Sequence, residues 1–157
     1  MSPHGPHTEA NVVKITLRGA PDRPGMAAGI FSSLGQRGIN VDLITASAIG
    51  GGRSDVSFIV SQQDLDRVTE TMETLRAEFE AEEVLIDPNV AIVSLQVAEL
   101  VQTPGTAGRM FAALSGRGIN IDMISTSMAS ITCVIPENRV EDAVRVLEEE
   151  FGRRRDS

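Results

Sequence analysis

The sequence contains no tryptophan and no tyrosine, and its five phenylalanines bring aromatic residues to only 3 %. Stacking platforms for nucleic-acid bases and aromatic cages for cations both need several such rings, so the composition disfavours them. Basic residues are also in the minority, because 14 Lys and Arg face 22 Asp and Glu and give a formal net charge of −8. A chain this acidic has no general attraction to nucleic acid or to anionic membranes. We expect neither as a partner.

Cysteine and histidine are nearly absent, with one and two residues respectively. A single cysteine cannot form an internal disulfide, so the reducing cytoplasm is the expected location. A dedicated zinc or redox site needs several such ligands, and we therefore expect no metal and no cofactor. The sequence has no apolar run long enough to cross a bilayer and no N-terminal signal segment. With 41 % hydrophobic residues, it is typical of a soluble domain with an aliphatic core.

Two stretches of the chain, about eighty residues apart, carry the same residues in the same order. Pro24-Gly25 recurs as Pro104-Gly105, and the Arg-Gly-Ile-Asn segment ending at Asn40 recurs ending at Asn120. The Asp87-Pro88-Asn89 triplet between the stretches is typical of a turn. The repeat predicts two units, over residues 12–88 and 89–151. A flexible N-terminal arm over residues 1–11 and a charged tail over residues 152–157 would flank them.

The first unit has the pattern of a ferredoxin-like α+β domain. Residues 12–19 alternate between apolar and polar and predict a strand, and Pro24 begins a helix that ends at Gly38. Strands over 40–49 and 54–60 follow, joined by three glycines. An amphipathic helix then carries Leu65 to Phe79, and residues 83–87 form a last strand. This βαββαβ order is the split βαβ plan.

The second unit follows the same plan but runs out before its fourth strand. We expect strands over 91–98 and from Asn120 and Ser130, with helices over 104–117 and 140–151. The charged tail is not a strand, and residues 1–11 are too rich in Pro, Gly and His to replace it. Because proteins usually cover an open sheet edge, we expect this edge to pair with a partner chain.

The start of the first predicted helix is the first candidate site. Its free N–H groups and positive dipole end attract a carboxylate, and Gly25 permits close approach. Asn40 and Asn120 follow, each with an amide that can both donate and accept, which suits a zwitterion. The plainer alternative is that Asp-x-Pro-Gly only starts a helix and Gly-x-Asn only makes a turn, and this alternative is the more frequent one.

Other polar groups give weaker signals, and none completes a catalytic set. The Gly50–Gly52 run lacks the Gly-Lys-Ser/Thr ending of a phosphate loop. Asp42 and Asp122 have no histidine, lysine or nucleophile beside them, so we interpret them as solvated strand ends. Cys133 lies in an apolar strand and is expected to be buried. His4 and His7 are a weak metal signal. We assign no catalytic residues.

Several segments resemble the ACT domain. In the first unit these are GAPDRPG over residues 19–25, GINVDLI over 38–44 and SDVSF over 54–58. In the second unit GINIDMISTS over residues 118–127 and ITCVI over 131–135 are similar in the same way. The resemblance is strongest to the paired ACT units in the regulatory part of aspartate kinase, and it covers nearly the whole chain.

This resemblance implies an amino-acid sensor that lacks the kinase domain and controls the kinase allosterically, with effectors bound between ACT units. It implies threonine or lysine as effector, with threonine preferred because the pocket would be small and rich in hydroxyls. It also implies a homodimer and a kinase catalytic subunit as partners. The implied ligand-binding residues are Asp22, Pro24, Gly25, Met26 and Ala27 at the first helix start with Asn40 beside it, Asp42, Ser54 and Asp55 on the facing strands, and Ile119, Asn120, Thr126 and Ser127 of the second unit.

The chain departs from the family pattern in places. Val97–Leu100, Thr45–Ser47 and Met128 differ from the usual residues, and the segment that in the family closes the second unit's sheet is expected to be missing. Three alternatives stay open: a ligand-independent scaffold protein, a stand-alone amino-acid sensor of another pathway, and a non-catalytic subunit of aspartate kinase.

Overall fold

The computed structural model describes residues 6–96, 104–127 and 130–152. The chain forms two compact units. One unit comprises residues 11–88, and the other combines residues 89–152 with residues 6–10. The elements are β1 (Pro6–Pro21), α1 (Met26–Gln36), β2 (Asp42–Gly50), β3 (Arg53–Ser61), α2 (Leu65–Glu78), β4 (Glu83–Gln96), α4 (Thr106–Gly116), β5 (Met123–Thr126), β6 (Ser130–Pro136) and α5 (Val140–Phe151).

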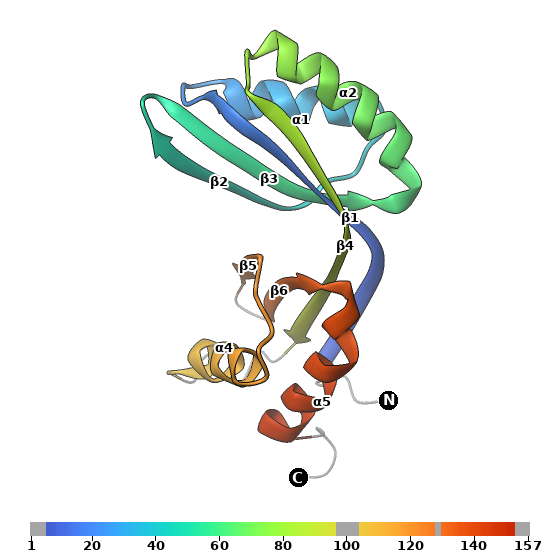
Figure 1. The fold of residues 1–157 in the computed structure, drawn as a ribbon, viewed down its shortest axis with the longest axis vertical. Coiled ribbons are helices and arrows are strands. Elements are labelled where there is room, and N and C mark those ends of the chain that lie inside the picture. Colours follow the sequence, from blue (N-terminus) through green and yellow to red (C-terminus); the bar gives the residue numbers. More distant parts are fainter. Residues whose placement is uncertain (1–5, 97–103, 128–129, 153–157) are drawn as a thin grey trace. The chain divides into compact units, whose positions relative to one another are not determined.

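The unit formed by residues 11–88, called the first unit here, is a four-stranded sheet with two helices on one face (Figure 1). Its strands lie in the order β2-β3-β1-β4, and both β1 and β2 pair antiparallel with β3. Short 3₁₀ turns lead into the second helix of each unit, over Gln62–Asp64 and Glu137–Arg139. The predicted βαββαβ order is confirmed.

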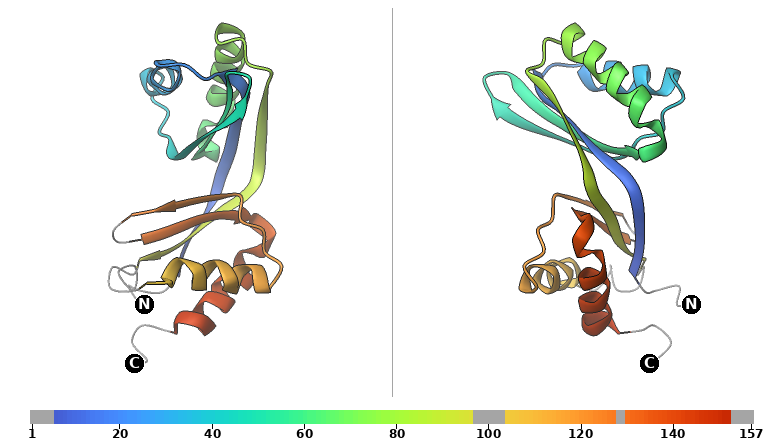
Figure 2. Two further views of the ribbon diagram at one scale, coloured as in Figure 1. Left: turned by 90° about the vertical axis from the view of Figure 1, so that its left-hand side faces the viewer. Right: turned by 45° about the vertical axis from the view of Figure 1, so that its right-hand side comes forward.

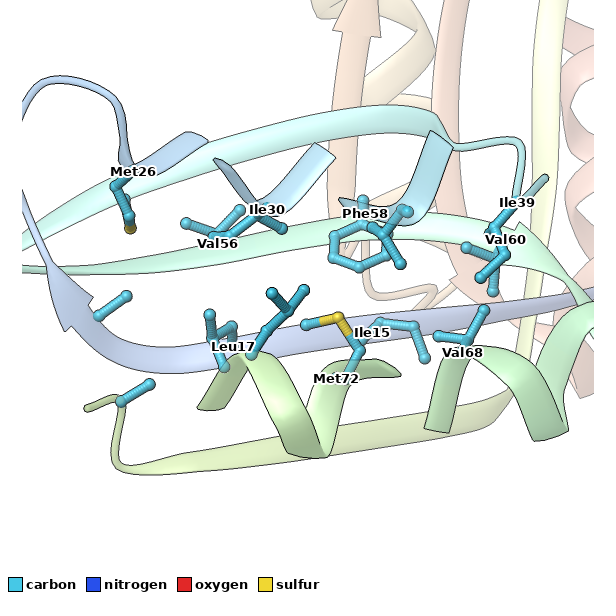
Figure 3. Packing of buried hydrophobic residues seen from close by; sticks show 14 of the residues in the cluster. Ile15, Leu17, Met26, Ile30, Ile39, Val56, Phe58, Val60, Val68 and Met72 are labelled. Carbon is cyan, nitrogen blue, oxygen red and sulfur yellow. The ribbon is translucent and has the colours of Figure 1, made fainter. Parts of the chain in front are cut away.

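The core of the first unit lies between this sheet and its helices. Alternate residues of β1, such as Ile15 and Leu17, are fully buried against Leu34 of α1 and Met72 of α2. Figure 3 shows Ile15 and Met72 close together in this core, with Phe58 of β3 beside them. The period of two in β1 therefore places every second side chain under the helices, as the sequence pattern predicts.

The second unit repeats this arrangement, with the strand order β1-β4-β6-β5 and with α4 and α5 on one face (Figure 2). Met110, Leu114, Cys133 and Leu147 are fully buried in its core. Cys133 is thus buried, as expected. Residues 153–157 of the predicted tail lie outside the described residues.

Residues 6–11 contradict the expectation of a flexible arm over 1–11, and residues 1–5 of this predicted arm lie outside the described residues. Strand β1 begins at Pro6, and residues 6–10 group with the second unit, where β1 is the neighbour of β4. The edge that we expected to be open is therefore occupied from the N-terminal side. Asn11 lies where β1 passes from one unit to the other and has φ of 61°. Asparagine tolerates this left-handed conformation better than most residues do. The segment gave no strand signal because its side chains are mostly exposed and polar, and Pro6 stands where a strand's first residue needs no N–H.

Within the described ranges, no helix has the length and apolar character that a membrane crossing would need.

Candidate functional site

The connection from β1 to α1 forms the first candidate site. The ladder between β1 and β3 is interrupted after Leu17 and resumes at Ala20, so Arg18 and Gly19 together face the single residue Asp55. Gly19 has φ of 68°, a conformation that glycine adopts without strain. This β-bulge turns the chain toward α1.

Helix α1 starts at Met26, directly after Gly25 in the left-handed conformation with φ of 89°. No side chain caps this end, and an added Cβ at Gly25 would meet nothing within 4 Å. Pro24 and Ala27 are exposed beside it, whereas Met26 is buried in the core. The Met26 N–H donates to the Arg23 carbonyl at 3.3 Å. Because the first N–H groups of a helix have no partner within the helix, those of Ala27 and Ala28 can bind a carboxylate.

Asp22 is exposed in the same connection, and its N–H donates to the carbonyl of Gly52 at 2.8 Å. On β3, Ser54 pairs with Ala20 and is buried, and Asp55 accepts a hydrogen bond from the Gly19 N–H at 2.9 Å. The structure therefore brings Asp22, the residues from Pro24 to Ala27, Ser54 and Asp55 to one end of the first unit.

Asn40 and Asp42 lie at the other end of the first unit. Asn40 follows the C-terminal end of α1, whose eleven residues span about 16 Å. Asp42 pairs with Ile59, whereas Ser54 pairs with Ala48, six residues or about 20 Å farther along β2. The expectation that Asn40 and Asp42 border the same helix start is wrong within one unit, because both follow the end of α1 rather than its beginning. Their role as ligand contacts stays a prediction.

The second unit repeats this geometry. Gly105 precedes α4 with φ of 89°, like Gly25 before α1. Ile119 is buried and Asn120 is exposed, both after the C-terminal end of α4. Thr126 ends β5, and Ser127 follows with its N–H donating to the Ser130 carbonyl at 2.9 Å. The predicted residues of this unit therefore also divide between the two ends of a strand.

Sequence reasoning missed Arg53, whose guanidinium lies beside the bulge. One of its nitrogens, Nη1, donates to the carbonyl of Gly19 at 2.8 Å and to that of Glu80 at 3.1 Å. Its position, just after the glycine run and two residues before Asp55, was the available signal. Alternate residues of a strand share a side, so Arg53 and Asp55 reach the same segment.

A hollow of about 250 Å³ lies at the other end of α1, lined by Arg37, Arg67, Glu70, Thr71 and Thr74. Its arginine donors are occupied within the protein, because Arg67 donates to the Arg37 carbonyl and to Asp64.

In residues 6–96, 104–127 and 130–152, no three His, Cys, Asp or Glu side chains gather as metal ligands. The start of α1 thus offers backbone N–H groups for binding the carboxylate of a small molecule.

Comparison with known proteins places the chain among ACT-domain proteins. Two ACT-domain models match, over residues 15–77 and 93–151. An aspartate kinase of Stutzerimonas stutzeri is 36 % identical over 138 residues, which are 88 % of this chain and 34 % of the kinase. The chain therefore spans about a third of the curated relatives that it matches.

Solved structures match over nearly the whole chain. The ligand-free regulatory subunit of aspartate kinase from Thermus thermophilus is 35 % identical, with a TM-score of 0.88 over 94 % of this chain and 97 % of that chain. A crystal structure of aspartokinase alpha and beta subunits contains a chain that is 33 % identical, with a TM-score of 0.87 and the same coverage. The chain belongs to the family of paired ACT-domain proteins that includes the regulatory subunits of aspartate kinase.

Proposed function

We propose that this chain is an amino-acid-binding regulatory module that gives allosteric feedback control of aspartate kinase in the cytoplasm. The observation that carries the proposal is its match to the Thermus thermophilus regulatory subunit, of which it covers 97 % at 35 % identity. The effector is a small amino acid, with threonine preferred to lysine. The chain itself supplies no catalytic residue, and its partner is a kinase catalytic subunit.

The helix start supports this proposal chemically. Pro24, Gly25 and Ala27 are exposed, so the N–H groups of Ala27 and Ala28 in the first turn of α1 are accessible to an α-carboxylate, and the helix dipole favours a negative charge there. The amides of Asn40 and Asn120 and the carboxylate of Asp22 accept hydrogen bonds from an α-ammonium group. The hydroxyls of Thr126 and Ser127 would select a polar side chain.

Self-association fits the division of the predicted residues between the ends of each unit. If a second copy of the chain brings its own strand ends to a helix start, the two groups of residues can share one effector. Strand β2 is an edge of the sheet and exposes Ile44 and Ile49, with 52 % and 51 % of their surfaces accessible. An apolar edge of this kind favours pairing with another chain. We therefore propose a homodimer.

The second candidate function is a scaffold that assembles through the same edge without any ligand. The exposed isoleucines favour it as well, because they require a partner but no effector. A stand-alone sensor for another pathway is the third. Amino-acid binding is expected of the kinase regulator and of the sensor for another pathway, but not of the scaffold. Regulation of aspartate kinase is expected of the kinase regulator alone.

Isothermal titration of the full chain with each of the twenty amino acids tests the proposal. We expect threonine to bind with micromolar to millimolar affinity, and the Asn40→Ala variant to bind it roughly tenfold more weakly because an amide hydrogen bond is lost. Asn138→Ala, at an exposed asparagine outside the predicted site, is the matched control and should bind like the wild type. Silence from all amino acids, alone and with a kinase catalytic subunit, would overturn the proposal.

A further inference from the structure

The β-bulge of the first unit leaves backbone groups that the sheet does not satisfy. Arg18 and Gly19 face one residue of β3, so the N–H and C=O of Gly19 do not continue the ladder. Backbone polar groups away from water need a partner, or their desolvation costs stability. The residues that supply these partners therefore decide how firmly the bulge is held.

Two side chains of β3 supply both partners. Asp55 Oδ1 accepts the Gly19 N–H at 2.9 Å, and Arg53 Nη1 donates to the Gly19 carbonyl at 2.8 Å. Both side chains are half-buried. Hydrogen bonds with a charged partner are stronger than neutral ones, and here the carboxylate meets the donor and the guanidinium meets the acceptor.

Arg53 also joins the bulge to a third segment. Its second hydrogen bond runs to the carbonyl of Glu80, in the turn between α2 and β4. From the same turn, the Glu82 N–H donates to the carbonyl of Arg18 at 2.8 Å. The end of β1 is thus held from β3 on one side and from the α2–β4 turn on the other.

Arg53 and Asp55 together form a clamp on Gly19, and this clamp also determines where α1 begins. After the bulge, Pro21 pairs with Arg53 in the resumed ladder, and the Asp22 N–H donates to the Gly52 carbonyl at 2.8 Å. Only Arg23, Pro24 and Gly25 then separate this fixed point from the first residue of the helix. A shift of the bulge would therefore move the helix start directly.

The second unit has a different residue at the position of Asp55. Val56 and Ile131 occupy matching core positions on β3 and β6, so Asp55 corresponds to Ser130. Among the residues that the structure describes, the carboxylate that accepts the Gly19 N–H is therefore a feature of the first unit.

We propose that Arg53 and Asp55 are positioning residues that hold the first helix start in its ligand-binding conformation. This inference rests on the proposed function, and it changes the role predicted for Asp55. Its carboxylate acts through Gly19 rather than on the amino acid. Arg53 has the complementary role, because it fixes the other polar group of the same peptide segment.

The test compares four variants of the full chain. Arg53→Met and Asp55→Leu each remove one side of the clamp, whereas Asp55→Asn retains an oxygen that accepts the Gly19 N–H. Arg76→Met is the control, since it removes an arginine of the same unit that pairs with Glu73 of its own helix, α2. Threonine affinity is measured by isothermal titration, and amide hydrogen exchange is followed in peptides covering residues 18–30, the rest of the first unit and the second unit.

We expect Arg53→Met and Asp55→Leu to bind threonine about tenfold more weakly and to exchange faster only within residues 18–30. Asp55→Asn and Arg76→Met should stay within twofold of the wild type in affinity. Unchanged affinity in Arg53→Met, or faster exchange throughout the first unit, would overturn the inference, because Arg53 would then be dispensable or a general stabiliser.

The two proposals fail in different ways. If the wild type binds no amino acid, the proposed function is wrong and the exchange of residues 18–30 alone decides on the clamp. Faster exchange confined to that segment in Arg53→Met then supports the clamp, and unchanged exchange overturns it. If the wild type binds threonine and Arg53→Met binds it equally well, the function stands and the positioning role falls.

Discussion

Several arginines of this chain act on backbone carbonyls. Arg53 donates to Gly19, Arg67 to Arg37 at 2.6 Å and Arg139 to Arg117 at 2.8 Å. A planar guanidinium with five N–H donors can serve a carbonyl and a carboxylate at once. Single arginine side chains therefore hold the turns of this fold. Replacing one of them should destabilise the helix end or strand end whose carbonyl it contacts.

The buried thiol of Cys133 gives a prediction at the scale of one residue. Burial raises its pKa from 9.0 to about 11, because desolvation disfavours the thiolate. The thiolate is the reactive form, so at pH 8 the native chain should react with a disulfide reagent about 100-fold more slowly than the urea-unfolded chain. Absorbance of the released thiol measures both rates, and Cys133→Ala is the blank. Similar rates for native and unfolded chain would contradict the burial.

The same shift has a definite sign for stability. The folded pKa lies above the unfolded one, so the folded state holds the proton more tightly. The stabilising contribution of this thiol is complete below pH 9 and is lost as pH rises from 9 toward 11. The free energy of unfolding of Cys133→Ala should therefore fall less steeply over this range than that of the wild type.

At the scale of the helices, the two units hold equivalent turns with reversed charges. Asp64 and Arg67 begin the second helix of the first unit, and Arg139 and Asp142 occupy the matching positions of the second. In both units the arginine donates to the carbonyls that end the preceding helix. Both units thus share the contact between an arginine and the end of the preceding helix, although the arginine occupies a different position of the turn in each unit.

This equivalence predicts a charge-swap rescue. Arg67→Asp alone should destabilise the first unit by about 1 kcal/mol, because the helix end loses a charged donor and two acids meet. Adding Asp64→Arg should restore most of the loss, since it recreates the arrangement of Arg139 and Asp142. Urea unfolding followed by circular dichroism at 222 nm measures both variants.

The control moves the arginine to a neighbouring position of the helix. The double variant Arg67→Asp with Asp66→Arg has the same net charge as the charge swap. Its new arginine lies at position 66, which is exposed and is not part of the Asp64–Arg67 pair. We expect it to remain as unstable as the single variant. Equal recovery in both double variants would show that net charge, and not the contact to the helix end, sets the stability.

Local pattern predicted most of these elements. The period of two in β1 and the apolar stripe of α2 each reflect burial against one core, so the order of strands and helices could be inferred. The strand over residues 6–10 could not, because its exposed polar side chains carry no such period. The separation of Asn40 from Gly25 could have been inferred, because the helix predicted from Pro24 to Gly38 already lies between them. The bulge at Gly19 depends on a register that only the folded sheet defines.

At the scale of the whole molecule, the unpaired edges bear on assembly. Ile44 on β2 and Ile124 on β5 occupy matching positions of the repeat and are 52 % and 46 % exposed. Both strands lie at the ends of the strand order β2-β3-β1-β4-β6-β5. Apolar side chains on a free edge are avoided in monomers, so their recurrence supports self-association.

Ile44→Asp tests this assembly. A carboxylate on the edge strand should weaken the proposed homodimer at least about tenfold, because a charge buried at an interface is costly to desolvate. Sedimentation velocity over a range of concentrations measures the dissociation constant. Thr69→Asp adds the same charge at an exposed position of α2 and should leave the dissociation constant of the dimer unchanged. A monomeric wild type, or a dimer unaffected by Ile44→Asp, would contradict an interface at β2.

The proposed function requires that amino-acid binding by this chain regulates a kinase. The most direct test is an activity assay of an aspartate kinase catalytic chain, with and without this protein, across threonine concentrations. We expect threonine to inhibit only when this chain is present, and over the concentration range in which it binds, because effector and partner binding are linked. Kinase activity that does not respond to threonine in the presence of the bound chain would show that this chain is not a threonine-dependent regulator.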